Sequence, residues 1–494
     1  MPQRQFNLID EGWIPVSGGR FVGLKTVFSD TGIEALEGNP TEKAAVFKLL
    51  QAIGEAACKL KTEEDWNALS FESFQQKCLG YLAQWHDRFD LYGERSFLQM
   101  PAVARAECKS YGALNPETAT GNATVLTQFQ VERSLSDAER ALLLVRLMGF
   151  APGGKKTDNS VILAEGYTGK SKAGKPGPSL GFLGALHSFA FADNVVKSVW
   201  LNLMTEEQVL GMKIYPQGVG VAPWEEMPVS EDCPVARRLK QSLMGRLVPM
   251  CRFCLFSDEG VHYTEGVQHP THMNGVYDPS MTVRLGAKDL KVIWTDPQKR
   301  PWRSLAAILS FLSGTTSGKD HFDCRQLAVA LTRVRRTLGE NARISVWSGG
   351  LRVSSNAGEQ YVAGSDDYVA SELSLTTECI SQTWFLRFAD EIGRLDVLAK
   401  HLYGSVLGYC TDFKAKGADR ADQAVRAFWK AAEQEVQNLV DACADGNLED
   451  VRALYGRMAR AAYDEACPHE TPRQVIAWVR HIPNTSNKSK KHHG

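Results

Sequence analysis

A change in the spacing of apolar residues near position 370 divides this 494-residue chain into two parts. Beyond it, apolar residues recur at intervals of three and four, which is the spacing of helices that bury one face. The pattern predicts helices at 372–412, 421–443, 448–466 and 472–481. Short connections between successive helices favour antiparallel packing. We therefore expect an antiparallel four-helix bundle over 369–483 and a polar, basic, disordered tail over 484–494.

The first 368 residues mix strand and helix patterns, which predicts a large α+β domain. Two apolar runs around Gly18-Gly19 indicate a β-hairpin. The apolar spacing that follows predicts a helix with Thr41 as its N-cap. Further helices are expected at 66–89, 134–150 and 325–338, strands at 243–295, and either a buried helix or a strand plus a helix at 182–204.

Composition and charge exclude several classes of protein. Apolar residues make up 44% of the chain and charged residues 23%, as in a soluble protein with a real core. The 56 Lys and Arg residues against 57 Asp and Glu leave a net charge of −1, so any contact with nucleic acid has to be local. The odd number of cysteines, eleven, argues against a disulfide framework. With neither a signal-like start nor an 18-residue apolar run, we expect a cytoplasmic protein without a membrane segment.

Two long polar loops are expected, at 108–130 and at 151–181. The second contains seven glycines, three prolines and five lysines, and carries a local charge of +3. Its segment 164–171 resembles a relaxed Walker A motif. However, the Pro and Gly residues that follow Lys170 prevent the helix that such a motif needs. We therefore favour contact between this loop and a phosphate backbone.

Metal and catalytic motifs are weak. Cys251-x2-Cys254 precedes two histidines, His269 and His272, whose spacing is one residue tighter than usual for zinc. The same cysteines fit a plain strand as small apolar residues. His86-Asp87 resembles the dipeptide of metal phosphohydrolases, but further ligands are not apparent. We therefore expect no catalytic residues, no metal and no cofactor, with zinc at the two cysteines as the disfavoured alternative.

A hairpin is expected from Ile344 to Tyr361, with a turn at 355–358. Its tip carries Ser355, Asn356 and Ala357, small residues that can approach a base edge or enter between base pairs. An ordinary hairpin turn is the alternative interpretation.

Seven sequence blocks together carry a resemblance to one family. They are residues 7–16 (NLIDEGWIPV), 88–99 (RFDLYGERSFLQ), 121–124 (GNAT), 151–155 (APGGK), 199–203 (VWLNL), 347–352 (WSGGLR) and 355–361 (SNAGEQY). The chain resembles the CasA family, the large subunit of the type I-E CRISPR Cascade complex. The resemblance spans nearly the whole chain, and the opening block is its most specific part.

The resemblance implies a non-catalytic subunit that recognises the protospacer-adjacent motif in double-stranded DNA and starts R-loop formation. Base pairing to the guide RNA then reads the rest of the target. The implied partners are the guide RNA, the target DNA, the backbone, small and guide-5′-end subunits of Cascade, and the helicase–nuclease that degrades the target. The bundle is implied to contact the small subunit and to help admit the helicase–nuclease.

Site residues follow by position within the matching blocks. Gly153, Gly154 and Lys155 match a glycine-rich loop, and Lys155 and Lys156 are expected to contact phosphates. Ser355, Asn356 and Ala357 match a wedge hairpin, although a glutamine stands at the position of Asn356 in well-known members. Asn122 and Thr124 lie in the loop that is implied to dock on the guide RNA or a neighbouring subunit.

The family's lysine-bearing loop matches residues 268–274, which hold no lysine. The expected donors are then Gln268, Asn274 and the two imidazoles, with Asn274 the main one and His269 or His272 a weaker second. A purely structural loop is the alternative. For the whole chain, the alternatives are a nucleotide-hydrolysing or nuclease enzyme that uses the Lys170 loop or His86, and a scaffold subunit that does not read DNA.

Overall fold

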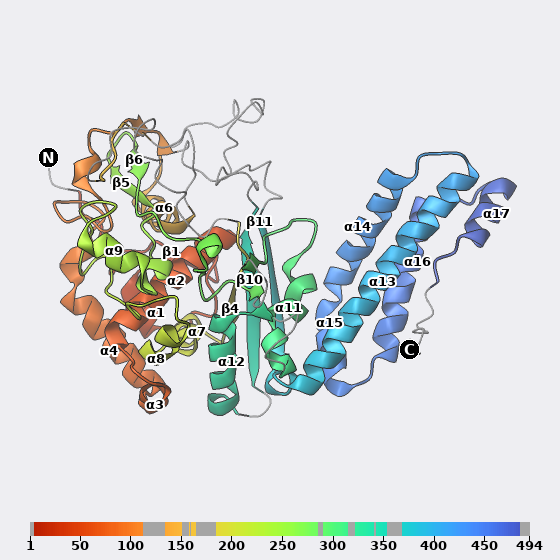
Figure 1. Cartoon of the computed structure of the whole chain (residues 1–494), viewed down its shortest axis with the longest axis horizontal. Coiled ribbons are helices and arrows are strands. Elements are labelled where there is room, and N and C mark those ends of the chain that lie inside the picture. Colours follow the sequence, from red (N-terminus) through yellow and green to blue (C-terminus); the bar gives the residue numbers. More distant parts are fainter. Residues whose placement is uncertain are drawn as a thin grey trace. The chain divides into compact units, whose positions relative to one another are not determined.

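The computed structural model describes most of the chain (Figure 1). The described residues are 4–111, 134–150, 158, 160–164, 184–284, 290–314, 322–339, 342–352 and 368–484. The chain forms two compact units. The first comprises Met1–Pro301, Ser317–Thr337 and Ile344–Glu372, and the second Trp302–Thr316, Leu338–Arg343 and Leu373–Gly494. The first mixes helices with small sheets and the second is helical, so the predicted α+β class with a C-terminal helical bundle is confirmed.

The N-terminal hairpin forms as predicted. Strands β1 (Ile14–Val16) and β2 (Arg20–Val22) pair antiparallel, with Ile14 opposite Val22. Gly18 and Gly19 connect them with φ of 86° and 70°, a left-handed conformation that glycine adopts without steric cost. Helix α1 (Leu24–Ser29) follows directly.

Helix α2 (Pro40–Cys58) is the central helix of the first unit and contacts α4 (Phe71–Gln84), α6 (Asp137–Gly149), α7 (Val195–Asn202) and α10 (Met244–Leu247). The predicted N-cap, Thr41, is wrong. Asn39 caps the helix because Pro40 takes the first helical position, where a missing N–H costs nothing. The Asn39 side chain accepts hydrogen bonds from the backbone of Thr41 and Glu42, and Glu42 bonds back to the Asn39 N–H.

The single helix predicted over 66–89 is divided into α3 (Glu63–Ala68), α4 and a 3-10 turn at His86–Arg88. Thr62 caps α3 by accepting from the Asp65 N–H, and Ser70 caps α4 by accepting from the Ser73 N–H. Ser and Thr at such positions favour a helix start over a helix interior, because their hydroxyl groups satisfy the free N–H groups of the first turn.

The first unit contains further helices and strands, and the last of these strands ends within the second unit. Its helices include α8 (Glu206–Gly211), α9 (Pro234–Lys240) and α12 (Arg325–Thr337). The strands are β3 (Cys108–Lys109), β4 (His187–Phe191), β5 (Arg252–Phe256), β6 (Val261–Glu265), β7 (Val283–Arg284), β8 (Lys291–Val292), β9 (Phe322–Asp323), β10 (Arg343–Leu351) and β11 (Tyr368–Thr376). Within the described residues they form three small sheets, with strand orders β11-β10-β4, β3-β6-β5 and β8-β7-β9.

These elements mostly agree with the predicted pattern. Within the predicted segment 182–204, residues 187–191 form a strand and 195–202 a helix, and residues 325–337 form the predicted helix. The predicted strand region 243–295 begins instead with α10. The predicted hairpin retains its first strand as β10, whereas its turn and Tyr361 lie outside the described residues, and the next described strand starts at Tyr368.

Aromatic side chains join the β10–β4 pair to α2. Phe189 of β4 lies opposite Trp347 of β10, with ring centroids 6.0 Å apart. Phe47 of α2 packs on Phe189 at 4.8 Å. Aromatic pairs at this spacing add stability beyond the area that they bury, so this cluster holds the sheet against the central helix.

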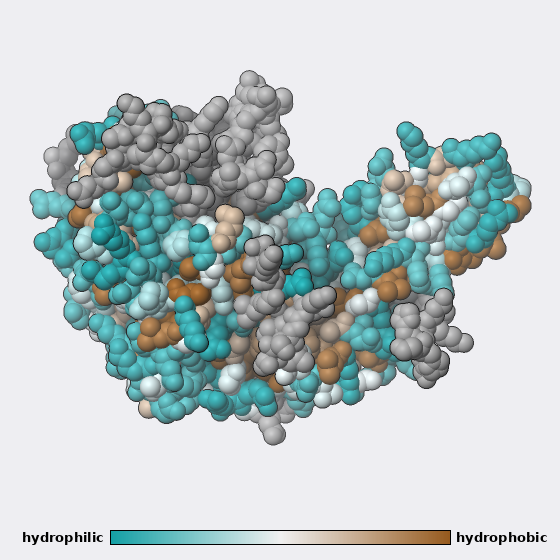
Figure 2. Space-filling view, in the orientation of Figure 1, coloured by the Kyte–Doolittle hydropathy of each residue, from teal (hydrophilic) through white to brown (hydrophobic). Residues whose placement is uncertain are grey.

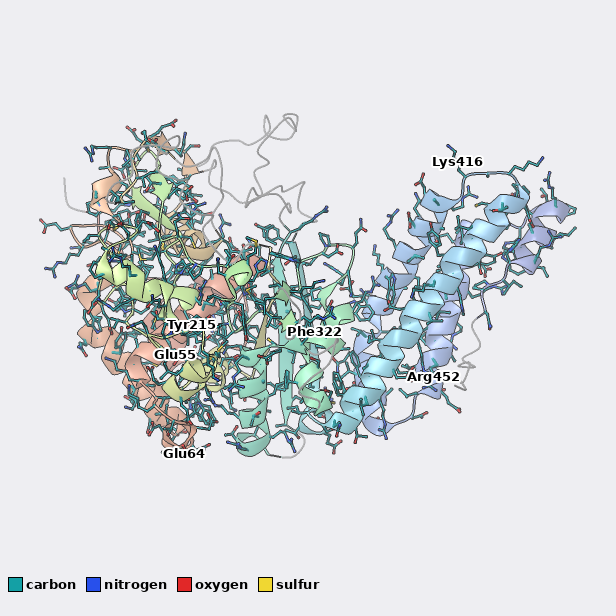
Figure 3. All side chains as sticks on the ribbon, in the orientation of Figure 1. Glu55, Glu64, Tyr215, Phe322, Lys416 and Arg452 are labelled. Atoms are coloured by element: carbon teal, nitrogen blue, oxygen red, sulfur yellow. The ribbon has the colours of Figure 1, made fainter. Side chains whose placement is uncertain are left out.

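Buried polar groups of the first unit are paired across distant segments. Arg333 of α12 donates to Glu63 of α3 and to the carbonyls of Leu201 and Leu203. Glu55 of α2 is fully buried and accepts from the Met204 N–H at 2.6 Å (Figure 3). Burial raises the pKa of Glu55 to about 8, although its hydrogen bonds and Arg333 oppose this change.

The second unit contains α11 (Leu305–Ile308), α13 (Gln382–Asp412), α14 (Ala418–Gln434), α15 (Val436–Asp445), α16 (Glu449–Ala466) and α17 (Pro472–Arg480). Figure 1 shows α13, the α14–α15 segment and α16 running in alternating directions. Arg452 of α16, labelled in Figure 3, donates from Nε to Glu391 of α13 at 3.0 Å. The predicted Thr471 cap with Gln474 is confirmed.

Two predicted helix boundaries in this unit are wrong. The first helix starts at Gln382 rather than 372, because the preceding residues form strand β11 and Ser381 caps the helix. The helix predicted over 421–443 is interrupted at Glu435, whose ψ of 8° lies outside the helical region.

Replacing either of two glycines in neighbouring helices by alanine should change the free energy of unfolding, with opposite signs at the two positions. A Cβ at Gly54 of α2 would lie 2.9 Å from Leu203 Cδ2 and 3.2 Å from Phe74, so Gly54→Ala should destabilise the first unit by about 1–3 kcal/mol. A Cβ at Gly80 of α4 would meet nothing within 4 Å, so Gly80→Ala should stabilise it by about 1 kcal/mol. Urea unfolding of both variants measures this, and equal signs would contradict the packing described.

Candidate nucleic-acid interface

Most residues predicted to contact nucleic acid lie outside the described part of the chain. They are Asn122, Thr124, Gly153, Gly154, Lys155, Lys156, Lys170, Ser355, Asn356 and Ala357. Asn274 is described, together with the whole loop that joins β6 to β7. The geometry of this loop is therefore the part of the predicted interface that can be built from its residues.

The loop is fixed to the first unit by hydrogen bonds along its length. Arg246 of α10 donates to the Pro270 carbonyl at 3.2 Å. His269 Nε2 lies 2.7 Å from the Pro249 carbonyl. The Tyr215 hydroxyl donates to the Tyr277 carbonyl at 2.5 Å. The partners come from well before the loop in sequence, so its backbone is positioned by the surrounding fold.

A buried ion pair holds the end of the loop. Lys48 Nζ of α2 lies 2.6 Å from Asp278 Oδ2, and both side chains are almost fully buried. Burial lowers the pKa of Lys48, and the attraction of Asp278 opposes this change. Burial alone would raise the pKa of Asp278, but Lys48, His187 and the hydrogen bond from Ser280 together lower it. The carboxylate is thus stabilised in its ionised form.

The tip of the loop is a 3-10 turn, η5 (His272–Asn274), followed by Gly275 with φ of 77°. Asn274 is exposed, and its Oδ1 accepts from the Thr271 N–H at 3.0 Å. Its Nδ2 has no hydrogen-bond partner among the described residues. The amide oxygen therefore caps the turn, while the amide nitrogen is left to donate to another molecule.

Of the two histidines predicted as alternatives for a weaker second donor, His269 is excluded. The ring is buried, and its Nε2 is committed to Pro249. Burial and the nearby Arg246 lower the pKa of His269 to about 3. Gln268 is half-buried and donates to the Gly266 carbonyl at 3.1 Å, so it is also turned to the protein.

His272 is half-buried against Trp294, with the ring centroids 5.3 Å apart, and burial lowers its pKa. Two apolar residues at this tip were missed by the sequence analysis. Met273 is 77% exposed and Trp294 is 50% exposed. A single Met inside a polar loop carries no periodic pattern, and Trp294 comes from a segment beyond β7, so neither could be placed here from spacing.

The described geometry does not fit zinc at the predicted spacing. Cys251 and Cys254 are both buried, Cys254 within strand β5 and Cys251 directly before it. Among the described residues, no group of three or more His, Cys, Asp or Glu side chains is arranged to hold a metal.

Two groups of hydrogen-bonded side chains could be taken for catalytic sites. His86 Nε2 lies 2.7 Å from Asp10 Oδ2, and both side chains are half exposed, as in a surface hydrogen bond. Ser280 lies between Asp278, at 2.7 Å, and His187, at 2.9 Å. A catalytic triad instead places the histidine between the serine and the acid, and all three residues are buried. This chain of hydrogen bonds therefore fits a structural role at the loop base.

None of the described helices is both long and apolar enough to cross a membrane. The family model for CRISPR-associated protein Cse1 matches residues 7–466. The chain belongs to the Cse1 family. The predicted family is thereby confirmed, since the curated relative described next carries the joint name CasA/Cse1.

That relative, CasA/Cse1 of Thermus thermophilus, is 29% identical over 334 residues, which cover 62% of this chain and 60% of the relative. Among solved structures, CasA of Thermus thermophilus matches with a TM-score of 0.69 at 19% identity, covering 97% of this chain and 98% of that one. Thermobifida fusca Cse1 matches with a TM-score of 0.70 at 17% identity, covering 97% of each chain. A chain of a CRISPR RNA-guided surveillance complex matches with a TM-score of 0.65 at 16% identity, covering 97% of this chain and 99% of that one. At these identities the solved structures establish the fold.

The ion pair under the loop makes a prediction about stability. Lys48→Met leaves a buried, unpaired carboxylate and should cost about 3–5 kcal/mol. Adding Asp278→Asn should restore much of this loss, because an amide oxygen still accepts from the Ser280 N–H and hydroxyl and carries no charge. Urea unfolding of both single variants and the double variant measures the coupling. If the double variant were no more stable than Lys48→Met, the buried charge would not be the cause.

Proposed function

We propose that this chain is the large, non-catalytic subunit of an RNA-guided CRISPR surveillance complex of the Cascade type. The observation that carries the proposal is the match of the Cse1 family model over residues 7–466. The fold likeness to a chain of a CRISPR RNA-guided surveillance complex over nearly the full length supports it. In this role the chain acts in the cytoplasm and needs no cofactor.

The proposed task is to recognise the protospacer-adjacent motif in double-stranded DNA and to start R-loop formation. Gly153, Gly154 and Lys155 are the proposed glycine-rich loop at the minor groove, and Lys155 and Lys156 add phosphate contacts. Asn274 is the proposed reader in place of a lysine. Its exposed side chain and available Nδ2 support this role, since minor-groove edges offer acceptors at N3 and O2.

The proposed wedge consists of Ser355, Asn356 and Ala357, and the guide-RNA or subunit-docking loop includes Asn122 and Thr124. The proposed partners are the guide RNA, target DNA, the backbone, small and guide-5′-end subunits, and the helicase–nuclease.

A patch on α17 supports contact between the bundle and another subunit. Val475, Ile476 and Val479 of this helix are exposed, and Figure 2 shows hydrophobic side chains at this end of the bundle. Exposed apolar patches of this kind mark interaction sites.

An enzyme that uses Lys170 or His86 is the competing function. In the part of the chain that the structure describes, no group of three or more His, Cys, Asp or Glu side chains is arranged to hold a metal, which argues against a metal site at His86. Purified chain with ATP or duplex DNA and Mg²⁺ tests this function, and turnover that is lost in Lys170→Ala or His86→Ala would replace our proposal with an enzyme.

The wedge makes the first functional prediction. The assembled complex should co-purify with a guide RNA, and replacing Ser355, Asn356 and Ala357 by glycines should slow R-loop formation on duplex DNA. Opening a base step costs a few kcal/mol, which the wedge helps to supply. Targets with a pre-opened bubble at the motif need no wedge and serve as the control. Equal slowing on both substrates would contradict the assignment, and absence of guide RNA from the complex would contradict the function itself.

Asn274 makes the second functional prediction. Asn274→Asp keeps the oxygen that caps the turn but removes the donor, so it should change motif preference without unfolding the loop. The acceptors at N3 and O2 are nearly the same for A·T and T·A pairs, so the wild type should distinguish these two poorly. A motif library screened against wild type and variant measures this. Unchanged relative preferences in the variant would assign motif reading to another loop.

A further inference from the structure

A polar cavity of about 270 Å³ lies where the end of α2 meets α4, and it shares no residue with the candidate interface. Its polar and aromatic lining consists of Lys59, just after α2, of Lys77, Tyr81 and Gln84 along α4, of Trp85, just after α4, and of Glu225. This cavity has no role in the proposed motif recognition, and the packing of the first unit does not explain it.

The charge of the lining favours an anion. Lys59 and Lys77 are exposed, and neither forms an ion pair with a described carboxylate. Glu225, the acidic residue of the lining, accepts from the Tyr81 hydroxyl at 2.7 Å, and Tyr81 in turn accepts from Trp224 Nε1 at 2.7 Å. The acid is therefore held by the protein, and the two ammonium groups leave a net positive cavity.

The backbone at Lys59 strengthens this interpretation. Lys59 has φ of 51° and ψ of 46°, the left-handed conformation that usually carries glycine at the end of a helix. A lysine near a helix C-terminus also complements the helix dipole. That explanation does not extend to Lys77, which lies inside α4 and faces the same cavity.

Two features of α4 provide room for a planar ring beside the lysines. Trp85 lines the cavity and is half-buried, with the Arg88 guanidinium 6.0 Å from its ring centroid, so part of its indole remains accessible. Gly80 lies one turn from both Lys77 and Gln84 at the edge of this face, and a Cβ there would meet nothing within 4 Å. Glycine weakens a helix interior, and packing does not require it here. The uncovered surface of α4 at Gly80, between Lys77 and Gln84, is called the open strip below. It leaves room for a ligand to approach.

We propose that this cavity binds a nucleotide, with its phosphate between Lys59 and Lys77 and its base against Trp85. Aromatic side chains accept bases by stacking, and the Gln84 amide offers both a donor and an acceptor to a base edge. The ligand is either a free mononucleotide or one nucleotide of a single-stranded nucleic acid. Both present the same phosphate and base. The site is independent of motif reading.

Isothermal titration of the full-length chain tests the proposal with adenosine 5′-monophosphate, an eight-residue oligothymidylate and inorganic phosphate. Lys59→Gly/Lys77→Gln should weaken nucleotide binding about tenfold, in line with the loss of charge-assisted contacts. Lys59→Gly also removes the steric cost of the left-handed backbone at this position. Weaker nucleotide binding by this variant would therefore not be explained by a loss of folding. The matched control is Lys25→Gln/Lys213→Gly, because Lys213 is likewise an exposed lysine with φ of 59°, and neither residue lines the cavity.

Gly80→Leu fills the open strip and should weaken nucleotide binding several-fold while Gly80→Ala changes it little. Tighter binding of the oligonucleotide assigns the site to single-stranded nucleic acid, and binding of the mononucleotide alone assigns it to a free nucleotide. The proposal is overturned if neither nucleotide binds, if phosphate binds as tightly as the nucleotides, or if the lysine double variant binds like its control. Because the isolated chain is titrated without guide RNA or duplex, none of these outcomes bears on motif recognition.

Discussion

The ion pair between Lys48 and Asp278 lies at the centre of a helix, α2, that is buried on nearly every side. Such a helix can carry polar residues only if each finds a partner. Lys48 pairs with Asp278 below the β6–β7 loop, Gln51 donates to the Asn202 carbonyl at 3.0 Å, and Glu55 accepts from the Met204 N–H. The partners of α2 thus fix both the end of α7 and the base of the loop that presents Asn274. The position of the candidate interface and the stability of the core around α2 therefore depend on the same contacts.

Much of the fold could be predicted because local patterns and tertiary packing agree. The three- and four-residue spacing beyond position 370 predicts the bundle, and Gly18-Gly19 predicts the first hairpin. Two of the errors occur where a polar residue competes for a helix end. Asn39 replaces Thr41 as a cap because of Pro40, and Ser70 starts a new helix inside a continuous apolar pattern. Side-chain hydrogen bonds of this kind decide boundaries that hydrophobic spacing alone leaves open.

The site was less predictable than the fold. Asn274 could be singled out as a donor because its loop has no lysine, and the exposed amide agrees with that. The burial of His269 could not be seen, since a histidine in a polar loop has the same sequence pattern whether it faces solvent or protein. The groups that hold the loop, Lys48, Tyr215 and Arg246, come from three distant segments. The family could still be identified, because the resemblance is carried by short contiguous stretches of sequence. Such stretches can be compared without knowing which distant segments are in contact.

Glu55 links the folding of the first unit to the uptake of a proton. Its pKa is about 8 in the folded chain and 4.5 ordinarily, so between these values the folded state holds a proton that the unfolded state has released. The stability contribution of this carboxyl is therefore fully present below about pH 4.5 and is lost as the pH rises toward 8, by about 1.4 kcal/mol per pH unit for one whole proton. Raising the pH from about 4.5 to about 8 thus removes stability from the helix that supports the β6–β7 loop. The heat of folding in this range also includes the ionisation enthalpy of the buffer that supplies the proton.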